Sequence, residues 1–206
     1  MQFLPFRKLP MVAPAPKMTL PDTFDGTAYR LADNWMPFLP VDATRPLRYA
    51  EVGAFYGANI VSVAMTYGAH PDSTLLAIDP WTDYGDYPEY KGQQTSIYET
   101  FCKNIAPYVP KIEPRRGYSH EVLPTLEDAA YDILYIDGNH EPEYVLEDAV
   151  LAFRKVKIGG HLIFDDYGWG GPDLTQRGID AFLSGYAKRL RVLGSRESQV
   201  FVQKLR

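Results

Sequence analysis

Three aspartates that follow two apolar runs are the residues of this sequence best suited to chemistry. Asp137 comes directly after the run 133–136, and Asp165 and Asp166 come directly after the run 161–164. If the two runs are neighbouring strands, the three carboxylates converge, and like charges in one place repel unless a cation neutralises them. Oxygen ligands suit a hard divalent ion such as Mg²⁺ or Mn²⁺. The residues therefore predict a metal site; solvated acids at strand ends are the alternative.

The segment between the two runs predicts the geometry that brings these acids together. Pro142 suits the first position of a helix, and apolar residues recur from there to Phe153 at helical spacing. A helical crossover between two short apolar strands makes them parallel neighbours. Their carboxyl ends then lie at the same edge of the sheet, where the three aspartates would meet.

A second candidate site follows the first predicted strand. Glu51, Gly53, Ala54 and Gly57 lie in one short run, and Asp79 ends the next strand about 20 residues further on. Glycines allow close approach of a ligand, and an acid in the position of Asp79 takes ribose hydroxyls. The spacing G-x-x-x-G differs from the dinucleotide fingerprint, which favours a nucleoside without phosphates. Tight packing in a turn is the alternative role of the glycines.

The other apolar runs alternate between strand and helix periods and predict an α/β fold. The expected strands include 47–52, 75–78, 111–115, 190–193 and 199–205, and the expected helices 60–67, 95–105, 119–126 and 174–186. The turn 194–198 is too short for a crossover helix, so the last two strands should form an antiparallel hairpin. We expect a doubly wound, Rossmann-like sheet of about seven strands, mostly parallel, that ends in this hairpin.

Two segments precede this alternating pattern. Residues 1–26 carry five prolines and predict an extended arm. The apolar side chains of the arm predict either a lid over its own domain or a contact within a homodimer, and a disordered tail is the alternative. Residues 27–206 should form one domain, which begins with a short amphipathic helix over 27–40 near the rim of the active site.

Composition excludes several classes of protein. Of the 206 residues, 46% are hydrophobic and 23% charged, which is typical of a folded globular chain. The net charge is −5 and no dense Lys/Arg tract occurs, so neither nucleic acid nor a membrane surface is an expected partner. The single Cys102 excludes an internal disulfide and suits a reducing, cytoplasmic compartment. No apolar run reaches the length of a membrane span or forms a signal-peptide core.

Several motifs together resemble the class I S-adenosylmethionine-dependent methyltransferases. They are E-V-G-A-F-Y-G, I-D-P-W, Y-I-D-G-N-H-E-P-E-Y, G-G-H-L-I-F-D-D-Y and R-G-I-D-A-F. Over about residues 45–206 the chain is most similar to the metal-dependent small-molecule O-methyltransferases. The resemblance implies transfer of the sulfonium methyl group to a hydroxyl oxygen that a Mg²⁺ or Mn²⁺ ion acidifies and orients. A sugar or glycoside diol is the favoured acceptor, with a catechol or phenol as the alternative.

Two rival functions carry less weight. A non-catalytic nucleoside-binding protein of the same fold would not need the set of acids. A nucleotide-sugar or dinucleotide oxidoreductase would need the missing dinucleotide fingerprint.

The resemblance also implies roles for individual residues. The motif around Gly53 and Gly57, with Glu51 and Ala54, would face the methionine part of the cofactor, and Asp79 would bind the ribose. Asp137, Asp165 and Asp166 would hold the metal. Trp81 would lie near the adenine or the rim, and Ser119 stands in a loop where relatives often carry an acid near the adenine. Aromatic residues on the loops of this edge predict a pocket wall, with core packing as the alternative: Trp81, Tyr84, Tyr87, Tyr90, Tyr167 and Trp169.

The proton acceptor is a further point of comparison. Some sugar-modifying relatives carry an Asp two residues after the first metal-ligand Asp, and this chain has Asn139 there. Catechol-type relatives carry a Lys three residues after it, and this chain has His140. The comparison implies that His140, beside Asp137, is the general base. A structural role at the start of the following helix, with the metal alone acidifying the acceptor, is the alternative.

Overall fold

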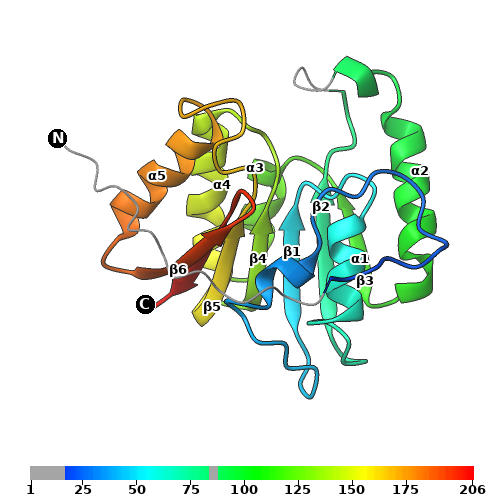
Figure 1. Ribbon diagram of the computed structural model, residues 1–206, viewed down its shortest axis with the longest axis horizontal. Helices are drawn as coiled ribbons and strands as arrows, with labels where there is room; N and C mark the ends of the chain where they lie inside the picture. The colour runs from blue at the N-terminus through cyan, green and yellow to red at the C-terminus, as the bar shows by residue number, and fades with distance from the viewer. Residues whose placement is uncertain (1–16, 84–87) are drawn as a thin grey trace.

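The computed structural model describes residues 17–83 and 88–206, and within these ranges seven strands form one sheet with helices on both faces (Figure 1). The strands are β1 (Arg48–Val52), β2 (Thr74–Asp79), β3 (Ile112–Arg116), β4 (Tyr131–Ile136), β5 (Val156–Phe164), β6 (Leu190–Arg196) and β7 (Gln199–Lys204). The α-helices are α1 (Ala58–Met65), α2 (Gln94–Ile105), α3 (Ser119–Val122), α4 (Pro142–Lys155) and α5 (Thr175–Tyr186). Short 3₁₀ helices are η1 (Ala32–Trp35), η2 (Pro88–Tyr90), η3 (Ala106–Tyr108) and η4 (Leu123–Thr125).

The order of the strands confirms the expected doubly wound fold. The sheet runs β3-β2-β1-β4-β5-β7-β6, with β1 to β5 parallel to one another and β7 antiparallel to both β5 and β6. From β1 the chain winds outward through β2 and β3, and it returns to the other side of β1 with β4. The switch point therefore lies between β1 and β4, and ligands of such sheets bind outside the carboxyl ends of the strands there.

The core lies in two layers because successive strand residues point to opposite faces. In β4, Leu134 and Ile136 belong to the core beneath α3, α4 and α5. Ile133 and Tyr135 belong to the core beneath η1, α1 and α2. Figure 1 shows these two helical layers on either side of the sheet. With apolar side chains toward both layers, the central strands are buried on both faces.

The pairing of β4 with β5 places the acids next to each other. Ile136 lies opposite Phe164 in a parallel register, and the Asp165 amide donates to the Ile136 carbonyl at 2.9 Å. The crossover helix α4 begins at Pro142 as expected and buries Val145 and Phe153 against the sheet. The strand–helix–strand prediction is therefore confirmed.

The predicted amphipathic helix over residues 27–40 is wrong, because only Ala32–Trp35 are helical and they form a single 3₁₀ turn. Pro37 and Pro40 have no N–H to continue a helix. The fully buried Trp35 packs its ring against the rings of Tyr49, Tyr67 and Tyr135, with centroid separations of 5.5 to 6.1 Å. The segment thus covers one face of the sheet, as the blue η1 in front of β1 shows in Figure 1, and does not form a rim helix.

The end of the predicted arm is bonded to the same domain. The Met18 amide donates to Asp33 at 2.7 Å, and the Asp25 amide donates to Asn104 at 3.0 Å. Residues 1–16 lie outside the described residues, so the boundary at residue 26, the lid and the homodimer contact stay predictions.

The C-terminal hairpin is tighter than predicted. Strand β6 continues to Arg196, and only Glu197 and Ser198 make the turn. Both have positive φ, of 46° and 65°, which is the backbone of a two-residue type I′ turn. The expected antiparallel pairing is confirmed, and the turn brings Gln199 to the carboxyl end of β5.

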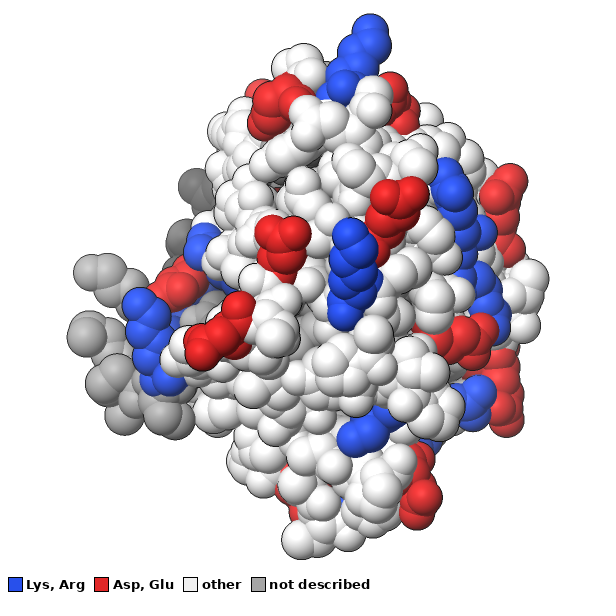
Figure 2. Space-filling view, turned by 90° about the vertical axis from the view of Figure 1, so that its right-hand side faces the viewer, with Lys and Arg blue, Asp and Glu red and all other residues white. Residues whose placement is uncertain are grey.

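On the face in Figure 2, Lys and Arg side chains are interspersed with Asp and Glu side chains among the described residues. In the parts of the chain that the structure describes, no helix combines the length and the apolar character that crossing a bilayer requires.

Candidate active site

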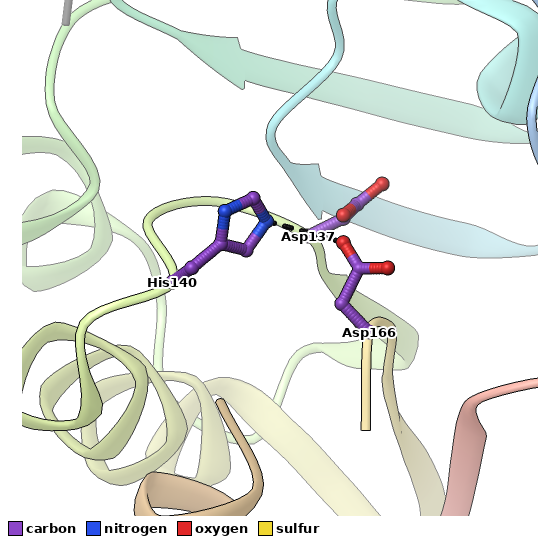
Figure 3. Close-up of side chains that lie close together, drawn as sticks. All are labelled: Asp137, His140 and Asp166. Carbon is purple, nitrogen blue, oxygen red and sulfur yellow. Dashed lines mark hydrogen bonds and ion pairs between the residues drawn. The ribbon is translucent and has the colours of Figure 1, made fainter. Parts of the chain in front are cut away.

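Three side chains meet at the carboxyl edge of the sheet. Asp137 follows β4, His140 lies in the loop before α4, and Asp166 lies beyond β5, and one ligand atom of each falls within 4.8 Å of the others (Figure 3). His140 Nε2 is 3.1 Å from Asp166 Oδ2. The imidazole is buried, so water has restricted access to the place where it faces the two carboxylates. This arrangement brings His140 into the predicted acid cluster.

Asp165 is not part of this group of three, and both of its oxygens have other hydrogen-bond partners. Its Oδ2 accepts hydrogen bonds from the Tyr135 hydroxyl and from Gln199 Nε2, the latter at 3.2 Å, and its Oδ1 accepts from the Asp166 amide at 2.8 Å. The group formed by Asp137, His140 and Asp166 therefore excludes Asp165. Its predicted role as a metal ligand stays a prediction.

Burial and nearby charges disfavour the ionisation of Asp137 and Asp165. Burial, together with the charges of Asp165 and Asp166, raises the pKa of Asp137 well above its usual range. Burial likewise raises the pKa of Asp165, although hydrogen bonding from Tyr135 opposes this. A divalent cation would reverse this balance by favouring the carboxylate forms. Two carboxylates and an imidazole are also a donor set that first-row divalent ions accept, so the residues fit such an ion.

The loop between β1 and α1 is held by Asp79. Its Oδ2 accepts from the amides of Ala54 and Phe55 at 2.9 and 3.0 Å, and its Oδ1 accepts from the Trp81 amide at 2.7 Å. The carboxylate therefore organises the backbone of the loop in which the predicted cofactor residues lie. The contact of Asp79 with ribose stays a prediction.

Gly53 joins this loop to the acid cluster. Its φ is +82°, and a Cβ at this position would overlap the carbonyl oxygen of Asp137. Only glycine fits, because a side chain here would force apart the ends of β1 and β4. Gly57 has φ +86° beside the Phe101 ring, so packing also accounts for this second glycine.

Glu51 offers an oxygen without a partner. The side chain is 1% exposed, and its Oε2 accepts from Tyr49 and Asn59 at 2.7 and 3.0 Å. Among the residues that the structure describes, the buried Oε1 has no hydrogen-bond partner. Burial raises the pKa of Glu51 to about 8. A buried acceptor left unpaired beside a ligand edge fits a cationic or N–H group of a bound molecule.

Comparison with known proteins decides the family. A family model described as a methyltransferase domain matches residues 50–167, more than half of the chain. The chain belongs to this methyltransferase family. The matched region runs from β1 to the residue after Asp166, so it includes both the loop that Asp79 holds and the acid cluster.

Two curated relatives of this methyltransferase are longer than the region that aligns with it. Protein R132 of Acanthamoeba polyphaga mimivirus is 29% identical over 59% of this chain and 52% of its own length. Protein y4gI of Sinorhizobium fredii is 27% identical over 61% of this chain and 14% of its own length. The chain thus aligns with about half of the first relative and a small part of the second.

Solved structures share the fold. The O-methyltransferase TomG from Streptomyces achromogenes, in complex with SAM, has a TM-score of 0.59 and 20% identity over 77% of this chain and 73% of its own. The O-methyltransferase NovP has a TM-score of 0.60 and 20% identity, over 78% and 73%. The SAH-bound methyltransferase PaMTH1 from Podospora anserina has a TM-score of 0.54 and 16% identity, over 78% and 73%. Together with the family match, these folds confirm the expected resemblance to class I methyltransferases.

The aromatic residues that we predicted to form a pocket wall have different contacts among the described residues, and the wall itself stays a prediction. Trp169 lies over the His140 imidazole, with ring centroids 4.2 Å apart. Tyr167 instead donates to Asp180 at 3.0 Å, and the Tyr90 ring packs against Phe55. Tyr84 and Tyr87 lie outside the described residues.

Trp81 disagrees with its expected place at the rim. It is 1% exposed, packs against Tyr98 and Phe101, and donates from Nε1 to the Phe55 carbonyl at 3.0 Å. The indole therefore fills the core beside α2, and a contact with adenine stays a prediction.

Ser119 begins α3 and hydrogen-bonds to Asp148, a buried acid of α4 that sequence patterns did not single out. Sequence reasoning also missed Thr175, whose hydroxyl donates to the Asp166 carbonyl at 2.5 Å. Asp148 falls within an amphipathic helix and Thr175 at a helix start, where acids and hydroxyls are common, so neither carried a signal. A direct contact of Ser119 with the cofactor stays a prediction.

The buried Asp148 is expected to make stability depend on pH. Burial raises its pKa from 3.8 to about 7. Between these values the folded state keeps a proton that the unfolded chain releases, so the free energy of unfolding should fall as pH rises toward 7. The slope for one such group is at most about 1.4 kcal/mol per pH unit. Urea unfolding at a series of pH values should give a shallower decline for Asp148→Asn than for the parent protein.

The neighbouring Glu147 provides the control for this measurement because its side chain is exposed. Glu147→Gln should keep most of the decline. Equal slopes for Asp148→Asn and the parent protein would contradict the expected buried titration.

Proposed function

We propose that this protein transfers the methyl group of S-adenosylmethionine to a hydroxyl oxygen of a small molecule with the help of a divalent ion. The observation that carries the proposal is the meeting of Asp137, His140 and Asp166 at the carboxyl edge of a methyltransferase-family sheet. The loop that follows β1 abuts this group, because Gly53 lies against Asp137. A methyl donor in that loop and an acceptor at the acid cluster would therefore be neighbours.

The loop suits S-adenosylmethionine through its unpaired acceptor. Glu51 Oε1 is buried without a partner among the described residues, and the methionine ammonium group is a donor that would satisfy it. TomG is in complex with SAM and PaMTH1 with SAH, and both share this fold, which supports the same co-substrate here. Asp79 would then stabilise the loop through its amide contacts while it faces the ribose.

For the metal, the proposed ligands are Asp137, Asp166 and one oxygen of Asp165. Asp165 Oδ1 accepts one hydrogen bond and keeps a second lone pair, whereas Oδ2 already accepts two. A bound Mg²⁺ or Mn²⁺ would lower the pKa of a hydroxyl that it contacts and hold that hydroxyl in place. The acid cluster would also select a vicinal diol, since two adjacent oxygens can share one ion.

His140 is the proposed base. Its imidazole lies beside Asp166 and under Trp169, which together fix the orientation of the ring. From this position it can accept the hydroxyl proton as the methyl group arrives. The indole of Trp169 offers an apolar face to a sugar or an aromatic ring. A sugar or glycoside diol is the favoured acceptor, and a catechol is the alternative.

Binding and turnover measurements test this proposal in two steps. Calorimetry should show S-adenosylhomocysteine binding and no binding of NAD. Methyl transfer to a panel of diol-bearing glycosides and catechols, followed as a mass increase of one methyl group, should need added Mg²⁺ or Mn²⁺ and stop with EDTA. Binding of NAD without the homocysteine nucleoside would exclude the methyltransferase function, and full turnover in EDTA would exclude the metal.

A further inference from the structure

A chain of hydrogen-bonded, buried side chains leads from Asn34, in the segment before the sheet, to the acid pair Asp165 and Asp166. Asn34 Nδ2 donates to Gln199 Oε1 at 2.7 Å. Gln199 Nε2 in turn lies 3.2 Å from Asp165 Oδ2 and 3.1 Å from the Tyr135 hydroxyl, which itself donates to Asp165. All four residues are at most 6% exposed. The chain thus connects η1, β7 and β4 to the end of β5 without passing through solvent.

In this series of hydrogen bonds, each side chain's partner determines which of its atoms donate and which accept. Asn34 donates to the oxygen of the Gln199 amide, which leaves the nitrogen of that amide to face Asp165. The buried Tyr135 hydroxyl donates to the same oxygen, Asp165 Oδ2, that Gln199 faces. With donors from Gln199 and Tyr135, Asp165 Oδ2 has no lone pair left for another group. The carboxylate is therefore held in one orientation.

This orientation determines the backbone of Asp166. Asp165 Oδ1 accepts from the Asp166 amide at 2.8 Å, and Thr175 donates to the Asp166 carbonyl. Asp166 has φ of +56°, a conformation that costs a non-glycine residue about 1–3 kcal/mol and persists only where neighbouring contacts enforce it. In this conformation its side chain lies 3.1 Å from His140 (Figure 3). The conformation of Asp166 thus depends on contacts with residues outside the acid cluster.

We propose that Gln199 and Asn34 are positioning residues of the active site, which hold Asp165 so that its Oδ1 accepts from the Asp166 amide and the side chain of Asp166 lies close to Asp137 and His140. Both lie outside residues 50–167, the region that the family model matches. The segment before the sheet, whose predicted helix is absent, would then be a working part of the catalytic domain. The assignment to metal binding rests on the proposed function, whereas the effect on the backbone of Asp166 does not.

The matched variants are Gln199→Met, which keeps the length of the side chain and removes both polar groups, and Asn34→Leu, one hydrogen bond further from Asp165. Tyr67→Phe is the control. Its hydroxyl donates to the Leu39 carbonyl at 2.6 Å, so it tethers the same segment through a buried hydrogen bond that has no link to the acid pair. A purely structural effect of loosening the segment would appear in all three variants.

Two readouts separate positioning from stability. Amide exchange of Asp166, followed by NMR in the protein without added metal, should accelerate about tenfold in Gln199→Met, less in Asn34→Leu, and not in Tyr67→Phe. The dissociation constant for Mn²⁺ should rise about 10- to 100-fold in Gln199→Met, as for other residues that orient metal ligands, while that for S-adenosylhomocysteine stays near the parent value.

The outcomes distinguish this inference from the proposed function. Parent-like exchange at Asp166 in folded Gln199→Met and Asn34→Leu would overturn the inference, as would equal acceleration in Tyr67→Phe. If Gln199→Met does not fold, the exchange rate of the Asp166 amide in Asn34→Leu alone tests the inference. A parent protein that binds no Mn²⁺ would refute the metal proposal, and the exchange rates would still decide whether Gln199 and Asn34 position Asp166.

Discussion

Replacing Asp137 with Asn is expected to lower methyl transfer at least tenfold and to weaken Mn²⁺ binding, while S-adenosylhomocysteine binds almost normally. Burial, together with the charges of Asp165 and Asp166, raises the pKa of Asp137, so this carboxylate gains most from a neutralising cation. An amide keeps the size of the side chain and removes the charge that the cation would neutralise. Initial rates over a Mn²⁺ titration, with calorimetry for the nucleoside, measure the two effects.

The same substitution should not destabilise the protein without metal. A buried carboxyl group with a raised pKa opposes folding when it ionises, and Asn removes that cost. Asp132→Asn is the control, since Asp132 is at the opposite end of β4 and bonds to Lys157 and the Arg48 amide. It should retain metal-dependent turnover. Full activity of Asp137→Asn would rule out the acid cluster as the metal site.

Replacing His140 with Gln is expected to have a larger effect, a fall in turnover of roughly 10² or more, the magnitude that general-base catalysis contributes. The imidazole is buried beside Asp166 and lies under Trp169, so it is oriented toward the acid cluster. Gln can keep a hydrogen bond to Asp166 and cannot accept a proton. Single-turnover rates at saturating Mn²⁺ and S-adenosylmethionine measure the change.

Metal affinity decides between two roles for His140. If His140 is a base and not a metal ligand, the Mn²⁺ dissociation constant of His140→Gln should be almost unchanged. A large loss of Mn²⁺ affinity would instead make the imidazole a third ligand with Asp137 and Asp166, which their mutual distances also allow. His161→Gln, on β5 and outside the acid cluster, is the control. Near-normal turnover of His140→Gln would show that the histidine is structural.

Local patterns in the sequence were enough to predict most of the fold. The apolar runs before Asp137 and Asp165, with Pro142 at the start of the helix between them, were enough to predict parallel neighbours and a common acidic edge. The short turn after β6 was enough to predict the antiparallel hairpin. These predictions succeed because strand period, helix period and turn length depend on residues close together in the chain.

The sequence-based predictions fail where contacts with residues distant in the chain determine the local structure. The spacing of Trp35 among apolar residues suggested a helix, but its contacts with three tyrosines of the core and the nearby prolines hold the segment in an irregular path. Trp81 follows a strand like a rim residue, yet α2 buries it. In both cases the burial of a large ring against other elements outweighed the local pattern.

The orientation of the acids is the part of the site that only tertiary structure decides. The sequence places Asp137, Asp165 and Asp166 at one sheet edge, because parallel pairing alone determines where strands end. Which carboxylate faces the shared space depends on hydrogen-bond partners from separate elements: Gln199 from β7, Tyr135 from β4 and the imidazole of His140. A hydrogen bond between residues 26 or more positions apart leaves no periodic trace in the sequence, so its consequences emerge only when the chain has folded.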